Sequence, residues 1–172
     1  MHSRQPPRRG STPPPAIMDE IRRHLSAREV QAMEALFMLR GTAQQVDNVV
    51  GEWMAGTVGS VARYQILMAL WATKGEGISH KDIVEAMRVT RATVSGLMAA
   101  LEQEGFVKSS VDKEDRRKLI ARLTPRGEAM IKKAFEVNLA RFRTLFASLS
   151  AADLKLLTDL LSRIREGFVA LR

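Results

Sequence analysis

The sequence predicts a mainly α-helical chain with one small β-hairpin, in which a small central lobe lies between long helices. In both terminal parts, apolar residues recur at steps of three and four, which is the spacing of amphipathic helices. Near the middle, short apolar runs at 106–108 and 119–123 flank a strongly charged turn, as in a hairpin. The 172 residues, 45% of them apolar, suffice for one domain with long extensions.

The N-terminal part is predicted to hold a tail and two helices. Residues 1–16 contain five prolines beside arginines and serines, so we expect a disordered, basic, Pro-rich tail. Residues 17–57 are assigned to N-terminal dimerisation helices, the first of them short. The second begins at Ser26, whose Ser-x-x-Glu spacing is that of a capping box. It is expected to run from about 27 to 54, where Gly56 and Gly59 end it.

The middle of the chain, residues 58–124, reads as a winged helix-turn-helix lobe. The expected order is a helix begun by Ser60, an extended residue at Ile78, a short helix capped by Ser79, a helix from Thr90 to Glu104, and the hairpin. In such a lobe the second helix of the turn enters the DNA major groove, and the hairpin tip contacts the minor groove or backbone.

The C-terminal part, residues 125–172, is assigned to C-terminal dimerisation helices. Thr124-Pro125 is a favourable helix start, and Ser150 caps the last helix. The last helix repeats apolar residues as a coiled-coil seam: Leu154, Leu157, Leu161, Ile164, Phe168 and Leu171. Burial within one chain is the simpler interpretation, but the central lobe is too small to cover three such helices. We therefore expect a homodimer.

Composition excludes several classes of protein. The net charge of +8 favours an anionic partner, nucleic acid before membrane. The absence of cysteine removes disulfides and thiol chemistry, and the three histidines are too widely spaced for a zinc site, so no metal or cofactor is expected. The sequence shows no long apolar run and no secretory signal, so we expect a cytoplasmic protein with no membrane partner. It also lacks the common catalytic motifs, so an enzyme is not expected.

The predicted DNA-binding residues lie at the start of the second helix and in the charged turn. The helix carries its apolar stripe on one face and small, polar side chains on the other, which allows close approach to DNA. From Lys108 to Arg126 there are seven basic and three acidic residues. The candidate residues are Thr90, Arg91, Thr93, Ser95, Lys113, Asp115, Arg116, Arg117 and Lys118.

The stretch from Arg63 to Gly127 resembles the MarR family of bacterial transcription regulators. The resemblance rests on Thr-Arg-Ala-Thr-Val-Ser at 90–95, on Leu-Glu-Gln-Glu-Gly-Phe-Val at 101–107, and on Asp-x-Arg followed by Leu-Thr-x-x-Gly at 115–127. It implies an obligate homodimer on a pseudo-palindromic operator, with Arg117 as the minor-groove arginine and Asp115 as its supporting acid. Many members carry arginines at the positions of Gly96 and Ala100, so base contacts are expected to be fewer here.

The same resemblance implies a small anionic aromatic effector, which we expect to be a hydroxybenzoate or hydroxynicotinate type acid. The candidate effector residues are Arg40, Trp53, Met54, Arg63, Tyr64 and His80. The aromatic residues suit a ring, and the arginines and the histidine suit a carboxylate. Taken singly, Trp53 and Tyr64 fit core positions equally well, and His80 fits an exposed capping turn.

The sequence therefore predicts a dimeric, sequence-specific transcription regulator, most simply a repressor that a small aromatic acid releases from its operator. The alternative is an architectural DNA-binding protein without a ligand. Binding that depends steeply on salt and shows no sequence preference would favour that alternative. A tail that contacts DNA through its arginines is compatible with both.

Overall fold

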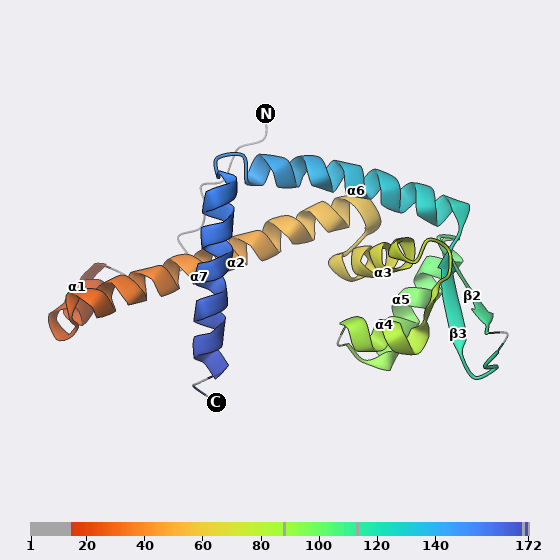
Figure 1. The fold of residues 1–172 in the computed structure, drawn as a ribbon, viewed down its shortest axis with the longest axis horizontal. Helices are drawn as coiled ribbons and strands as arrows, with labels where there is room; N and C mark the ends of the chain where they lie inside the picture. Colours follow the sequence, from red (N-terminus) through yellow and green to blue (C-terminus); the bar gives the residue numbers. More distant parts are fainter. Residues whose placement is uncertain (1–14, 88, 113, 170, 172) are drawn as a thin grey trace. The chain divides into compact units, whose positions relative to one another are not determined.

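The computed structural model describes residues 15–87, 89–112, 114–169 and 171. The chain divides into two units, the first ending at Val61 and the second beginning at Ala62. The predicted tail lies outside the described residues up to position 14, and its last two residues already belong to the first helix. The prediction of a mainly helical fold with a small antiparallel sheet is confirmed (Figure 1).

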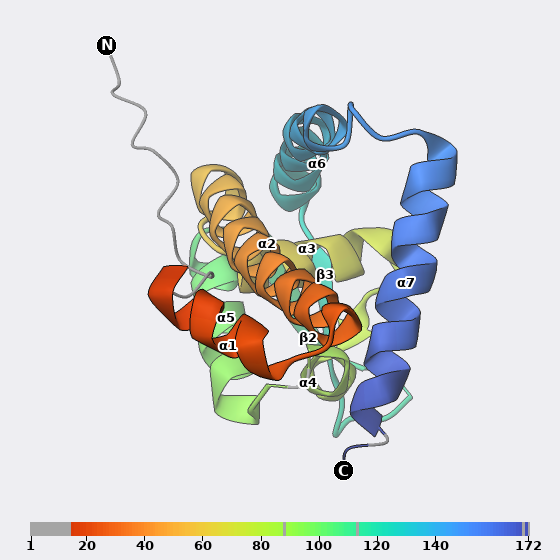
Figure 2. The same ribbon diagram turned by 90° about the vertical axis from the view of Figure 1, so that its left-hand side faces the viewer.

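The first unit consists of two helices, α1 (Pro15–His24) and α2 (Ala27–Val58). Figure 2 shows α1 folded back beside the start of α2, where Arg22 Nη2 contacts Glu34 Oε1 at 2.9 Å. The Ser26 capping box forms as predicted. The helix continues past the predicted end near residue 54 and through Gly56, and it stops at Gly59, the second of the two glycines predicted to end it. That glycine has a φ of 96°, and its amide N–H donates to the Met54 carbonyl.

The second unit contains the lobe and the two C-terminal helices. Its elements are α3 (Val61–Ala72), β1 (Ile78–Ser79), α4 (His80–Met87), α5 (Arg91–Gln103), β2 (Val107–Val111), β3 (Leu119–Leu123), α6 (Pro125–Leu145) and α7 (Ala151–Val169). The strand order is β1-β3-β2, and both pairings are antiparallel. The extended residue predicted at Ile78 is thus a strand that pairs with Ala121 of the hairpin.

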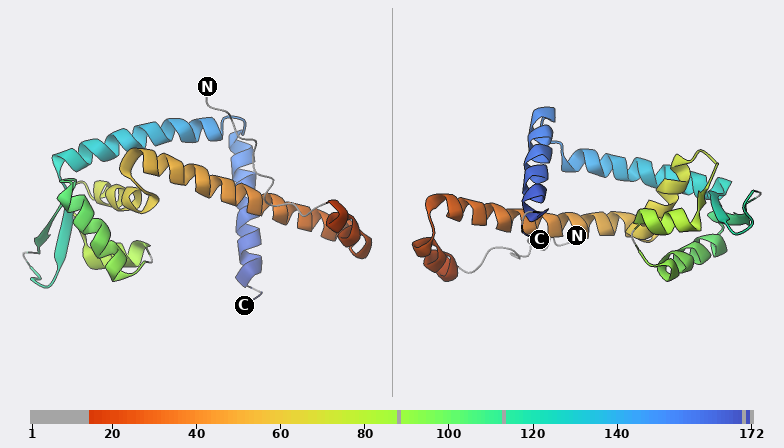
Figure 3. Two further views of the ribbon diagram at one scale, coloured as in Figure 1. Left: turned by 180° about the vertical axis from the view of Figure 1, so that it is seen from behind. Right: turned by 60° about the horizontal axis from the view of Figure 1, so that its bottom comes forward.

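The core of the lobe lies between α3, α5 and the sheet. Ile66, Leu67 and Leu70 of α3 are buried, as are three residues of the predicted α5 stripe. Those three are Val94, Met98 and Leu101. Leu97, also apolar, is only half-buried. This packing turns the opposite face of α5, with its small polar side chains, toward solvent. The two views in Figure 3 show α4 and α5 beside the paired strands.

The wing and α6 meet at a close backbone contact. Thr124 caps α6: its Oγ1 accepts from the Gly127 N–H at 3.1 Å and donates to the Gly105 carbonyl at 2.7 Å. The Thr124 N–H donates to the Phe106 carbonyl at 3.0 Å. A Cβ at position 127 would lie 1.9 Å from the Phe106 oxygen, so no side chain fits there. The Leu-Thr-x-x-Gly motif therefore has a structural role, which is to hold the start of α6 against the wing.

The C-terminal helices leave many apolar side chains exposed. None of the α7 residues, all of which the structure describes, is buried. Its seam residues Leu157, Leu161 and Ile164 are 40%, 40% and 44% exposed. On α6, Phe142 and Leu145 are also exposed. Exposed apolar stripes of this length are common at protein interfaces.

Gly127→Ala is expected to lower the free energy of unfolding by at least about 2 kcal/mol, because the Phe106 backbone must move to admit a methyl group. Urea unfolding followed by circular dichroism, at one fixed protein concentration, measures this change. The control is Gly96→Ala, a helical position of α5 with open space around it, where alanine should add about 0.5–1 kcal/mol. If the urea midpoint of Gly127→Ala equals that of the wild type, the close contact between Gly127 and Phe106 does not contribute to stability.

Candidate nucleic-acid interface

The N-terminus of α5 is the exposed end of the candidate recognition helix. Thr90 is its N-cap, and the Thr93 N–H donates to Thr90 Oγ1 at 3.2 Å. The two threonine hydroxyls lie 2.9 Å apart. Thr90, Arg91, Thr93 and Ser95 are all exposed. The unpaired amides at such a helix end carry partial positive charge, so this end suits a phosphate group. Thr90 has a structural role as well, because its oxygen fixes the first turn.

The wing turn is held by a side chain that the sequence reasoning did not single out. Asp112 Oδ1 accepts the N–H groups of Glu114 and Asp115 at 3.0 and 2.8 Å. The Asp112 N–H donates to the Lys118 carbonyl at 2.9 Å, which closes the turn. These backbone hydrogen bonds, first that from Asp115, hold the pKa of Asp112 below its usual range. An aspartate that begins a turn is the signal that would have found it.

Asp115 supports the wing arginine through the backbone. Its Oδ1 accepts the Arg117 N–H at 3.1 Å, and its Oδ2 lies 3.9 Å from Lys118 Nζ. The side chains of Arg116, Arg117 and Lys118 are exposed. Lys113, also predicted to contact DNA, lies outside the described residues. The turn thus presents at least three adjacent cations on a backbone that two aspartates hold in place.

One hydrogen bond ties the base of the wing to the lobe, and a second joins the two strands of the wing. His80 Nε2 and Ser109 Oγ are 2.9 Å apart, which links the start of α4 to β2. Arg122 Nη1 donates to Ser110 Oγ at 3.2 Å, which joins β3 to β2. His80 was predicted as an effector residue, and the structure shows it in contact with the wing strand.

Of the predicted effector residues, Arg63 has the most defined geometry. Its two terminal nitrogens donate to the two Glu104 carboxylate oxygens at 2.7 and 2.6 Å. The hydrogen bond to this carboxylate raises the pKa of Arg63, and the same bond lowers the pKa of Glu104. Glu104 is the C-cap of α5, so the pair joins the first turn of α3 to the end of the recognition helix. Glu104 was not among the predicted site residues.

Tyr64 belongs to a second polar group, together with Asn138 and Arg141. Of these three residues, only Tyr64 was predicted from the sequence as a site residue. Asn138 of α6 is 5% exposed, and its Oδ1 accepts from Arg141 Nη1 at 3.3 Å. Burial raises the pKa of Tyr64, and a hydrogen bond with Asn138 opposes that shift. The available signal was an asparagine on the apolar stripe of α6. The remaining candidates belong to the first unit, where Arg40 is exposed and Trp53 and Met54 are half-buried.

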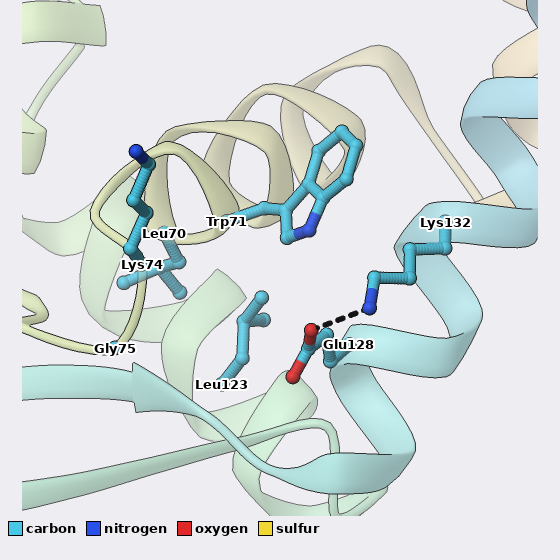
Figure 4. Close-up of a pocket in the computed structure, with 7 residues that line it drawn as sticks. All are labelled: Leu70, Trp71, Lys74, Gly75, Leu123, Glu128 and Lys132. Carbon is cyan, nitrogen blue, oxygen red and sulfur yellow. Dashed lines mark ion pairs between the residues drawn. The ribbon is translucent and has the colours of Figure 1, made fainter.

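A separate cleft of about 340 Å³ lies where α3 ends and α6 begins (Figure 4). Its lining residues are Leu70, Trp71, Lys74, Gly75, Leu123, Glu128 and Lys132. None of the predicted effector residues lines it. Lys132 Nζ is 2.7 Å from Glu128 Oε1, so an anion in this cleft would meet both a carboxylate and a cation that is already paired.

Among the residues that the structure describes, no group of three or more His, Cys, Asp or Glu side chains is placed to hold a metal ion. Over the same residues, no helix is both long and apolar enough to cross a membrane.

The order of elements, the exposed α5 terminus and the basic turn define a winged helix-turn-helix protein. The MarR family model matches residues 60–119. The chain is 26% identical over 137 residues to the HTH-type transcriptional repressor YetL of Bacillus subtilis, covering 77% of this chain and 82% of YetL. It is 29% identical over 135 residues to YdgJ of the same organism, an uncharacterized HTH-type transcriptional regulator, covering 78% and 79% of the two chains.

Among solved structures, Staphylococcus aureus MepR bound to DNA matches with a TM-score of 0.64 and 21% identity, covering 76% of this chain and 96% of MepR. The PcaV regulator of Streptomyces coelicolor, in complex with its natural ligand, matches with a TM-score of 0.59 and 22% identity, covering 73% and 90%. At these identities the likeness shows the fold alone. Over residues 60–119 the chain is thus similar to MarR-family regulators, and the relatives that cover most of it are named as HTH-type transcriptional regulators.

Asp112→Ala is expected to speed amide hydrogen exchange at Glu114 and Asp115 by about five- to tenfold, because both amides lose their acceptor. NMR-detected exchange measures the effect. Since the folded pKa of Asp112 is lowered, its support of the turn is present above the usual aspartate pKa and is lost as the pH falls through the lowered value.

Asp112→Asn is the matched control for this prediction, because the amide keeps an oxygen acceptor and should retain most of the protection. Wild-type exchange in Asp112→Ala would show that the carboxylate does not hold the turn.

Proposed function

We propose that the chain is a homodimeric, sequence-specific repressor that a small aromatic acid releases from its operator. The observation that carries the proposal is that a single lobe presents an exposed recognition-helix terminus and a basic wing turn. The apolar stripe of α7 supports the second copy that a two-fold symmetric operator requires.

On DNA, α5 is proposed to enter the major groove by its N-terminal end. Arg91 would donate to a guanine edge or a phosphate, while Thr93 and Ser95 would contact phosphates or bases. Thr90 would contribute mainly by holding the first turn in shape. Lys113, Arg116 and Lys118 would contact the backbone beside the wing.

In the same arrangement, Arg117 is proposed to enter the minor groove, with its backbone held by Asp115. The positions of Gly96 and Ala100 carry no hydrogen-bonding side chain. A share of the specificity is therefore expected from DNA shape.

The dimer is proposed to form through the terminal helices. A stripe of exposed leucine, isoleucine and phenylalanine along α7 costs free energy in water at about 25 cal/mol per Å² of apolar area. A second copy removes that cost for both chains at once, since a two-fold interface uses the same patch twice. It also sets the two recognition helices about 34 Å apart, roughly one turn of DNA.

The repressor role and the effector rest on two kinds of support. YetL is described as a repressor, and PcaV was solved with its natural ligand. In this chain, Arg63 and the Tyr64–Asn138–Arg141 group offer hydrogen-bond donors for a carboxylate and a hydroxyl. Arg40, Trp53, Met54 and His80 remain proposed contacts. The expected effector is a hydroxybenzoate or hydroxynicotinate type acid.

The direct test is fluorescence anisotropy with DNA from upstream of the chain's own gene, with and without a panel of small aromatic acids. Specific binding that one acid abolishes supports the proposal. Specific binding that no acid disturbs would reject the effector. Equal affinity for random DNA would favour the alternative, an architectural protein without a ligand.

Arg117→Ala is expected to weaken operator binding by about tenfold and to lower the slope of log Kd against log salt by about one. The side chain is exposed, so the melting temperature should stay near that of the wild type. Arg143→Ala removes the same charge from α6 and is the control. If Arg117→Ala binds the operator as the wild type does, the assignment of the wing is wrong.

Leu161→Glu is expected to shift the protein from dimer to monomer at micromolar concentration, because a charge enters the proposed apolar seam. Lys155→Glu, on the polar face of α7, should stay dimeric. Sedimentation equilibrium distinguishes the two results. A stable dimer of Leu161→Glu would remove the seam from the dimer interface.

A further inference from the structure

The ion pair between Arg63 and Glu104 ties an arginine of α3 to the C-terminal end of the recognition helix α5. The two side chains meet as a two-pronged pair at 2.7 and 2.6 Å. Arg63 is 19% exposed and Glu104 is 43% exposed, so the pair is in contact with solvent. Glu104 thus already occupies Arg63 in the way that a carboxylate ligand would, with two parallel N–H···O bonds.

The position of Glu104 makes its charge unfavourable unless a cation lies beside it. It is the C-cap of α5, and its N–H donates to the Ala100 carbonyl. The C-terminus of a helix carries partial negative charge, so a carboxylate there is repelled. Arg63 offsets this repulsion by direct contact. Arg126, whose guanidinium lies 5.0 Å from the Phe106 ring centre, adds a weaker attraction.

We propose that the carboxylate of the effector binds Arg63 in place of Glu104, and that this exchange loosens the end of the recognition helix and so releases DNA. The proposal rests on the function proposed above and assigns the way in which the effector acts. The effect of the effector need not pass through other residues, because Arg63 contacts Glu104 at the end of α5 directly.

The consequence for DNA binding follows from the chain after Glu104. Gly105 has a φ of 75°, and Phe106 then leads directly into β2 of the wing. When Glu104 loses Arg63, its uncompensated charge favours fraying of the last turn of α5. Both DNA-contacting parts, the helix and the wing, join at this turn. Its loosening therefore disturbs their relative positions in each protomer.

The first test measures ligand binding and DNA release separately, with 4-hydroxybenzoate as the probe. Glu104→Gln should bind the probe at least about threefold more tightly than the wild type, because no internal carboxylate competes for Arg63. The probe should nevertheless have little effect on the operator affinity of Glu104→Gln, so that the ratio of the affinities without and with the probe falls toward one. The reason is that this variant has no unpaired carboxylate at position 104 to loosen α5.

Two controls accompany this test. Glu102→Gln removes an equal charge from the same helix and should bind the probe and release DNA as the wild type does. The neutral analogue 4-hydroxybenzamide should have little effect on any variant. If Glu104→Gln binds the probe and releases DNA as the wild type does, the proposal is overturned.

Failure of 4-hydroxybenzoate to bind the wild type would reject the proposed effector class. The second test uses no ligand, so it tests the role of the ion pair in either case. Arg63→Gln should speed amide exchange at positions 104–106 by at least about threefold. The double variant Arg63→Gln/Glu104→Gln should return to within about twofold of the wild type, because the stranded charge is gone. The mechanism would be contradicted if Arg63→Gln exchanged these amides at the wild-type rate. It would also be contradicted if the double variant exchanged them as fast as Arg63→Gln does.

Discussion

The wing and the last two helices depend on one contact, in which the Gly127 backbone lies directly against the Phe106 carbonyl. Because no side chain separates them, α6 leaves the sheet at a fixed point. Thr124 reinforces that point by capping α6 and bonding to the loop before β2. In the proposed dimer, the exposed apolar face that follows is the one that meets the second copy. In that dimer, the contact would set the position of each DNA-binding lobe relative to the symmetry axis.

The net charge of +8 conceals three different uses of arginine and lysine in the second unit. Arg63 is paired with a carboxylate, and Arg126 packs over an aromatic ring. The wing cations at 116–118 remain exposed on a turn that carboxylates organise. Of these three groups, the wing cations are the ones placed to meet a phosphate backbone directly. Placement of charge, more than its total, thus favours sequence-specific recognition over general attraction to DNA.

Sequence periodicity and capping residues predicted nearly every element, because local chemistry decides where these helices begin. Ser26, Thr90 and Thr124 each cap the helix expected of them. The last residues of α2 were missed, because a glycine in open space on a helix need not stop it. The pairing of Arg63 with Glu104 was also missed, because it joins residues 41 apart and no local pattern records such a contact. The Asp112 turn had a local signal that the charge run around it concealed.

The measurement that tests the central claim most directly is hydroxyl-radical footprinting of the full chain on DNA upstream of its own gene, at about 0.15 M salt. The account predicts two protected segments related by two-fold symmetry, with centres about 10 base pairs apart. Each segment should combine major-groove protection by α5 with minor-groove protection by the wing. Even protection along the DNA, equal on a random sequence, would contradict a dimeric, sequence-specific regulator.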